Sequence, residues 1–176
     1  MKVLTKHQER LLLQGITEPR DRAVMNLLLN TGLRVRELCE LRWSSYIRAN
    51  AQLSYLEVDG RRVPLNSIAM DALVEMGLER QGRTEAEHIL KGLRGQPSIN
   101  IRAVQQMVKK YAAEANLNDV TPMALRHTFS QRIATGQNAN VIAQLTARHP
   151  VSVAQYQSKQ QATLTDLAVA VKRLPP

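Results

Sequence analysis

Apolar residues recur at helical spacing over most of this sequence. They return every three or four positions, which places them on one face of an α-helix. The breaks in this pattern coincide with residues that begin or end helices, such as Thr5 as an N-cap and Asn30-Thr31-Gly32 as a stop. The predicted helices carry the leucines at 11–13 and then cover about residues 19–30, 33–43, 66–78, 98–115, 122–135, 140–145 and 164–173.

One part of the chain has a different pattern. Residues 52–58 (QLSYLEV) alternate, Asp59-Gly60 is a strong two-residue turn signal, and residues 61–65 (RRVPL) return as a second strand. Residues 88–90 are a candidate third strand, after a polar loop. The fold class predicted is therefore mainly α with a small antiparallel β-sheet (α+β). No repeat or internal linker interrupts it, which predicts a single domain over residues 1–176.

Composition narrows the choice of partner. A formal net charge of +9 indicates a polyanion, and nucleic acid is the polyanion that a small basic domain most often binds. No apolar run approaches the roughly 20 residues of a membrane span, and the N-terminus is not a signal peptide. The single Cys39 excludes an intramolecular disulfide framework, no Cys/His cluster suggests zinc, and a cytosolic compartment is expected. With one tryptophan, four tyrosines and one phenylalanine, the chain lacks the aromatic platforms of a single-strand binder.

The residue types near the C-terminus suggest phosphoryl transfer. Arg126, His149 and Tyr156 follow one another in this order. Arginine holds phosphate through a planar fork of donors, histidine donates or moves protons, and tyrosine can attack phosphorus. Arg34, at the first turn of a predicted helix, is a second arginine suited to phosphate binding.

Each candidate also has a plainer reading when it is taken alone. Arg34 fits an exposed arginine in a charged helix, and Tyr156 fits a packing residue. Arg61 and Arg62 fit exposed hairpin arginines, and in strand geometry they point to opposite faces, so only one can face a given ligand. His127 fits a buried, hydrogen-bonded histidine. The functional reading therefore depends on the combination.

Taken together, these residues resemble the catalytic domain of the tyrosine recombinases, the phage integrase family, over nearly the whole chain. Residues 31–43 (TGLRVRELCELRW) and 121–129 (TPMALRHTF) look like the two arginine motifs of that family. Residues 61–65 (RRVPL) resemble the end of its β-hairpin. Two such motifs on both sides of a hairpin ending in Val-Pro-Leu are a specific combination.

The resemblance implies a reaction. Arg34 and Arg126 would clamp the scissile DNA phosphate, and Tyr156 would attack it in line, leaving a 3′-phosphotyrosyl link and a free 5′-hydroxyl. His149 would donate to a non-bridging oxygen, and His127 would orient Arg126 or the backbone. Because the covalent link stores the free energy of the phosphodiester, the family's reaction needs no cofactor and no metal.

The resemblance also implies the partners. The expected partner is double-stranded DNA, on which the protein would self-associate as a dimer or tetramer. A membrane partner is not expected, because the chain has no apolar run long enough to span one. The expected location is the cytoplasm, on prokaryotic nucleoid, plasmid or phage DNA. The last predicted helix, about 164–174, looks like the family's tail, which docks on a neighbouring protomer; packing on its own core is the other reading. The family's N-terminal DNA-clamping domain is absent, so the chain is either truncated or similar to short members such as fimbrial-switch recombinases.

Three departures from the family pattern bear on activity. Met123 stands where the family usually has a histidine, and the hairpin turn holds no lysine to protonate the leaving 5′-oxygen. Arg61 or Arg62 could supply positive charge there, but arginine, with a pKa above about 12, is a poor proton donor. Third, Arg148-His149 replaces the usual Gly-His pair, and seven positions instead of a longer gap separate His149 from the tyrosine. Loss of these two acid–base groups would lower the reaction rate by about 10²–10⁴-fold each.

Three functions therefore stay open at the level of sequence. The first is a site-specific recombinase. The second is a DNA strand transferase of the same fold, such as a relaxase-like or type IB topoisomerase-like protein. The third is a catalytically weakened DNA-binding or regulatory relative. The target site, the outcome among integration, excision, inversion and resolution, and the oligomeric state without DNA are not readable from the residues.

Overall fold

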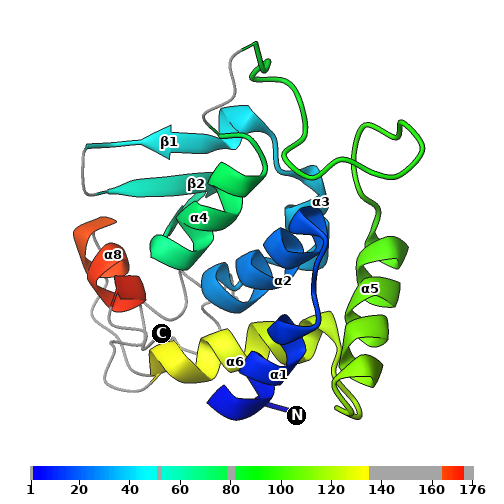
Figure 1. Ribbon diagram of the computed structural model, residues 1–176. Helices are drawn as coiled ribbons and strands as arrows, with labels where there is room; N and C mark the ends of the chain where they lie inside the picture. The colour runs from blue at the N-terminus through cyan, green and yellow to red at the C-terminus, as the bar shows by residue number, and fades with distance from the viewer. Residues whose placement is uncertain (1, 51–52, 79–81, 135–163, 173–176) are drawn as a thin grey trace.

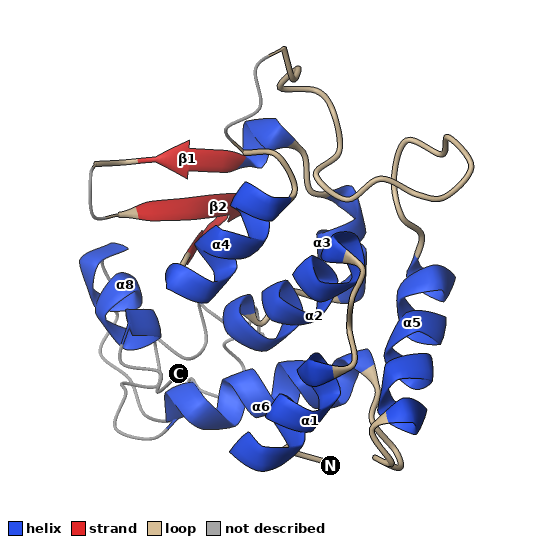
Figure 2. Ribbon diagram, viewed as in Figure 1, coloured by secondary structure: helices blue, strands red, loops and turns tan. Residues whose placement is uncertain are grey.

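The computed structural model (Figure 1) describes residues 2–50, 53–78, 82–134 and 164–172. Helices and a small sheet make up this part of the chain, as Figure 2 shows. The elements are α1 (Lys6–Gln14), α2 (Pro19–Thr31), α3 (Val35–Glu40), the 3₁₀ turn η1 (Trp43–Ser45), β1 (Tyr46–Arg48), β2 (Ser54–Val58), β3 (Arg61–Pro64), α4 (Ser67–Glu75), α5 (Ile101–Glu114), α6 (Pro122–Ala134) and α8 (Leu164–Lys172).

Capping residues fix the beginnings of several helices. The Thr5 side chain accepts a hydrogen bond from the Gln8 backbone N–H, and the Gln8 side chain accepts one from the Thr5 backbone N–H, so α1 opens with a capping box. Asn66 and Asn100 cap α4 and α5 in the same manner, by accepting from a backbone N–H three residues on. Helix α2 begins at Pro19, whose missing N–H costs nothing at that position. The predicted helices at these places are confirmed.

The described strands form an antiparallel sheet in the order β1-β2-β3. Asp59 and Gly60 join β2 to β3 with φ angles of 48° and 73°, the positive values that a tight hairpin turn requires. The predicted hairpin is therefore confirmed.

The prediction of a third strand at residues 88–90 was wrong. The third strand is β1, which pairs with β2, whereas His88 forms only an isolated bridge with Arg42. The prediction failed because the helix expected over about residues 33–43 ends earlier, at Glu40. Leu41 leaves the helix with φ and ψ angles of −58° and 126°, and its carbonyl accepts from the backbone N–H of Ile89 at 2.9 Å.

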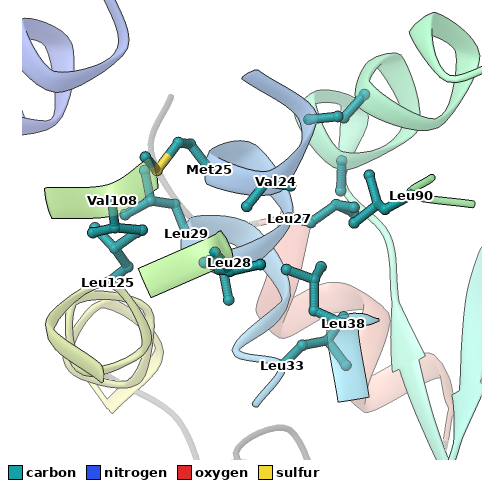
Figure 3. Close-up of a cluster of buried hydrophobic side chains, with 14 of the residues drawn as sticks. Val24, Met25, Leu27, Leu28, Leu29, Leu33, Leu38, Leu90, Val108 and Leu125 are labelled. Carbon is teal, nitrogen blue, oxygen red and sulfur yellow. The ribbon is translucent and has the colours of Figure 1, made fainter. Parts of the chain in front are cut away.

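Helix α2 lies at the centre of the fold, between α4 and α6 (Figure 1). It is buried on nearly all sides, as expected for a helix that is apolar around its circumference. Its side chains meet those of α3, α5 and α6 and of the segment before α5 in one apolar cluster. Figure 3 shows Val24, Met25, Leu27, Leu28, Leu29, Leu33, Leu38, Leu90, Val108 and Leu125.

A second, smaller apolar cluster joins α8 to the rest of the chain. Leu167, Ala170 and Val171 of α8 pack with Phe129 and Ile133 of α6. The same helix lies against β3, below the sheet in Figure 1. In this structure α8 thus packs on its own chain, while its exchange between protomers stays a prediction. The helix predicted over residues 140–145 lies outside the described residues.

Candidate functional site

The first arginine motif lies in the turn between α2 and α3. Gly32 ends α2 with a φ of +64°, and Arg34 is the N-cap residue of α3. The backbone N–H of Arg34 donates to Glu37 Oε2 at 2.6 Å. The Arg34 side chain is 54% exposed, so its guanidinium is accessible from solvent while its backbone is fixed.

Glu37 is the centre of this site. Its side chain is 3% exposed, and Oε2 also accepts from Arg61 Nη2 at 2.7 Å. Arg34 Nη1 lies 3.9 Å from Glu37 Oε1. A carboxylate this deeply buried is stable only when cations and donors surround it. Glu37 therefore brings the hairpin and the first arginine motif together.

The two hairpin arginines have different surroundings. Arg61 is mostly buried against Glu37, and burial lowers the pKa of its guanidinium, while the charge of Glu37 opposes that shift and the charge of Arg34 adds to it. Arg62 is exposed, 5.3 Å above the ring of Tyr55. The two side chains thus lie on opposite faces of the sheet, and Arg61 is the one beside Arg34.

The second arginine motif forms part of α6. Arg126 is 9% exposed and His127 is half-buried. The hydroxyls of Thr128 and Ser130 donate to the carbonyls four residues earlier, at 2.8 and 2.9 Å, and so do not interrupt the buried helix. Met123, in the first turn of α6, is 59% exposed.

Gly32 and Phe129 are the point at which the two motifs touch. A Cβ atom added to Gly32 would lie 2.4 Å from Cδ1 and 2.6 Å from Cε1 of Phe129, whose ring is fully buried. Gly32 is two residues before Arg34, and Phe129 is three residues after Arg126. Only a residue without a side chain allows the ring of Phe129 to lie this close to the backbone of the turn.

The remaining predicted site residues, His149 and Tyr156, lie outside the described residues. The structure thus brings Arg34 and Arg61 together around Glu37 and sets the helix of Arg126 against the same turn. Glu37 was not among the residues predicted from the sequence. The available signal was its position three residues after an N-cap, where a carboxylate can accept a hydrogen bond from the backbone N–H of the N-cap residue.

Other site types find no candidate in the described part of the chain. Residues 2–50, 53–78, 82–134 and 164–172 contain no group of three or more His, Cys, Asp or Glu side chains that could hold a metal ion. Within those ranges, too, no helix has the length and apolar character needed to cross a membrane.

The helical core with a three-stranded antiparallel sheet is the catalytic fold of the tyrosine recombinases. The structure of XerA recombinase superposes on all of this chain with a TM-score of 0.73 at 21% identity, covering 66% of that protein. The lambda integrase catalytic core superposes on 82% of this chain with a TM-score of 0.62 at 19% identity, covering 94% of that core.

Sequence comparison gives the family. The phage integrase family model matches residues 2–162, and the chain belongs to this family. Tyrosine recombinase XerC of Xylella fastidiosa (strain M23) is 35% identical over 117 residues, which is 65% of this chain. The match covers 39% of that relative's length.

Proposed function

We propose that this chain is the catalytic unit of a site-specific DNA recombinase, which breaks and rejoins duplex DNA through a phosphotyrosyl intermediate at Tyr156. The observation that carries the proposal is the arrangement around Glu37. There an accessible Arg34 is held beside Arg61, on the turn that packs against the helix of Arg126. Fixed guanidinium groups suit a phosphate whose negative charge rises in the transition state.

The reaction consists of two exchanges at phosphorus. The phenol of Tyr156 loses its proton as its oxygen bonds to the scissile phosphorus, the bond to the 5′-oxygen breaks, and that oxygen takes up a proton. A 5′-hydroxyl of a second duplex then loses its proton as it attacks the phosphotyrosyl phosphorus, the bond to the tyrosine oxygen breaks, and the released phenol regains a proton. Arg34 and Arg126 neutralise the charge on the non-bridging oxygens, and His149 donates to one of them.

Protonation of the leaving oxygen is the weak step in this chain. Arg61 is engaged with Glu37 at 2.7 Å and contributes positive charge rather than a proton. Arg62 lies on the other face, near Tyr55. We therefore expect this protein to cleave a DNA in which sulfur replaces the bridging 5′-oxygen about 10²-fold or more faster than the ordinary DNA. The reason is that a thiolate leaves without a proton.

The expected partner is duplex DNA, and α5 is our candidate for part of its binding surface. The outward face of α5 carries Arg102, Lys109 and Lys110, all exposed, together with Gln105 and Gln106. Cations on one face of a helix attract phosphates, and glutamine can pair with base edges. We also propose that protomers associate on DNA as a dimer or tetramer.

A nicked suicide substrate tests the activity. Cleavage next to the nick releases a short fragment, so the covalent intermediate accumulates and migrates as a protein–DNA adduct. We expect the wild type to form this adduct and the Tyr156→Phe variant to form none, although both bind DNA. If the wild type forms none on either the oxygen or the sulfur substrate, the enzymatic proposal fails.

Two observations favour a second candidate, a DNA-binding relative with weakened chemistry. Met123 is 59% exposed at the position of the family's histidine, and the hairpin turn holds no lysine. The Met123→His variant distinguishes the two. Adduct formation that rises from undetectable to measurable identifies a weakened enzyme, whereas a wild type that already cleaves efficiently rejects this candidate. Sequencing of the joined products separates recombination from relaxase-like or topoisomerase-like strand transfer.

A further inference from the structure

Arg132, near the end of α6, joins three helices at one point. Its Nη1 atom lies 3.1 Å from Oε2 of Glu9 in α1, and its Nη2 atom donates to the backbone carbonyl of Leu29 in α2. The side chains of both charged partners are nearly buried, at 13% and 11% exposure. Such a contact is more rigid than a surface ion pair, because water does not compete for its partners.

The contact with Leu29 fixes the end of α2. The last four carbonyls of a helix have no N–H donor from the helix itself, and Leu29 is among them because α2 ends at Thr31. A positive charge at this end also favours the helix dipole. Leu29 is three residues before Gly32 and five before Arg34, so Arg132 caps the helix end from which the first arginine motif begins.

The contact with Glu9 fixes α6 to the N-terminal helix. One turn earlier in α6, the Thr128 hydroxyl accepts from the backbone N–H of Leu4 at 2.9 Å. Thr128 and Arg132 are four residues apart and therefore lie on one face of α6. Two contacts on this face hold the second half of the helix that carries Arg126.

We infer that Arg132 is a positioning residue, which holds the turn of Arg34 and the helix of Arg126 at the spacing that one phosphate requires. The inference rests on the proposed function for its catalytic consequence, but its structural consequence is independent of it. In the proposed reaction Arg132 contacts neither DNA nor the reacting atoms. It acts through the end of α2.

Three variants and one control separate this role from general stability. Arg132→Met removes both contacts. The exchange Glu9→Arg with Arg132→Glu restores an ion pair but places a carboxylate against the Leu29 carbonyl, so it removes the cap alone. Glu9→Gln keeps the cap and removes the charge pair. Tyr111→Phe is the control, because it deletes a buried hydrogen bond to Asp21 of 3.0 Å at the other end of α2.

Amide hydrogen exchange of residues 30–37 is the direct readout. We expect about tenfold faster exchange there in Arg132→Met and in the double variant, and no change in Glu9→Gln or Tyr111→Phe. The double variant keeps the test valid if Arg132→Met does not fold. Unchanged exchange at residues 30–37 in the folded double variant would overturn the inference, as would equal acceleration in Tyr111→Phe.

Single-turnover cleavage of the suicide substrate gives the catalytic readout. Displacements of about 1 Å cost up to about 10²-fold in rate, so we expect cleavage about 10- to 100-fold slower in the two cap-deficient variants. Their DNA dissociation constants should stay within about threefold of the wild type. Cleavage at the wild-type rate in these variants would also overturn the inference. A wild type without cleavage refutes the proposed function instead, and the exchange experiment still tests Arg132.

Discussion

Replacement of Gly32 by alanine tests the contact that sets the two arginine motifs against each other. Two costs are expected. The φ angle of +64° is unfavourable for any residue with a Cβ, by about 1–2 kcal/mol. The new methyl group would also lie 2.4 Å from the buried ring of Phe129, and overpacking of this kind costs about 1–3 kcal/mol. Gly32→Ala should therefore destabilise the fold by about 2–5 kcal/mol.

Gly60 offers a matched control in the hairpin turn. Its φ angle is +73°, but a Cβ atom there would meet nothing within 4 Å. Gly60→Ala thus carries the conformational cost of about 1–2 kcal/mol without the steric one. The difference between the two variants, about 1–3 kcal/mol, isolates the contact with Phe129.

Urea unfolding followed by circular dichroism measures both free energies of unfolding. For a chain of 176 residues a difference of 1–3 kcal/mol also corresponds to about 2–12 °C in Tm, with Gly32→Ala the lower. Equal destabilisation by the two substitutions would refute the reasoning. In that case the turn of Arg34 would not be packed against α6 as described.

Three further predictions concern other residues. Burial, and after it the charge of Glu40, raises the pKa of the Cys39 thiol to about 11. Ellman's reagent should therefore react slowly with the native protein and quickly with the protein unfolded in urea. A fast reaction with the native protein would contradict this prediction. Burial, then the hydrogen bond to Asp21, raises the pKa of Tyr111 to about 12. The phenol of the unfolded chain loses its proton near the ordinary pKa of 10.0. The contribution of Tyr111 to stability should therefore be complete below pH 10 and disappear as the pH rises through 12. The Tyr111→Phe variant should lack this pH dependence. Substitution of Arg102 or Lys109 by alanine should reduce the slope of log binding constant against log salt concentration by about 1 each, and an unchanged slope would remove α5 from the DNA surface.

Much of the fold was predictable because its signals are local. The N-cap Thr5 and the Asp59-Gly60 turn each act within a few residues, and the structure has both at the predicted places. Asn66 and Asn100 cap the helices predicted over about residues 66–78 and 98–115. Strand β1 was missed because three residues are too short for a recognisable alternation. Its pairing with β2 depends on a partner strand that the sequence does not align with it.

The candidate site, too, was predictable only where its signals are local. The arginine motifs were readable as short patterns, and the structure packs the turn of Arg34 against the helix of Arg126 through Gly32 and Phe129. For Glu37 only the local contact with the Arg34 backbone had a sequence signal. Its pairing with Arg61 was not readable, because Arg61 is 24 residues away in the sequence. The pair of Arg132 with Glu9 spans 123 positions, and no local signal distinguishes these residues from other charged side chains on amphipathic helices.

We propose Tyr156 as the nucleophile of a DNA strand transfer. The most direct test is mass spectrometry of peptides from an adduct trapped on the suicide substrate with sulfur in the bridging position. We predict that the peptide containing Tyr156 carries a nucleotide through its 3′-phosphate. A nucleotide on any other residue, or attachment through a 5′-phosphate, would contradict the account.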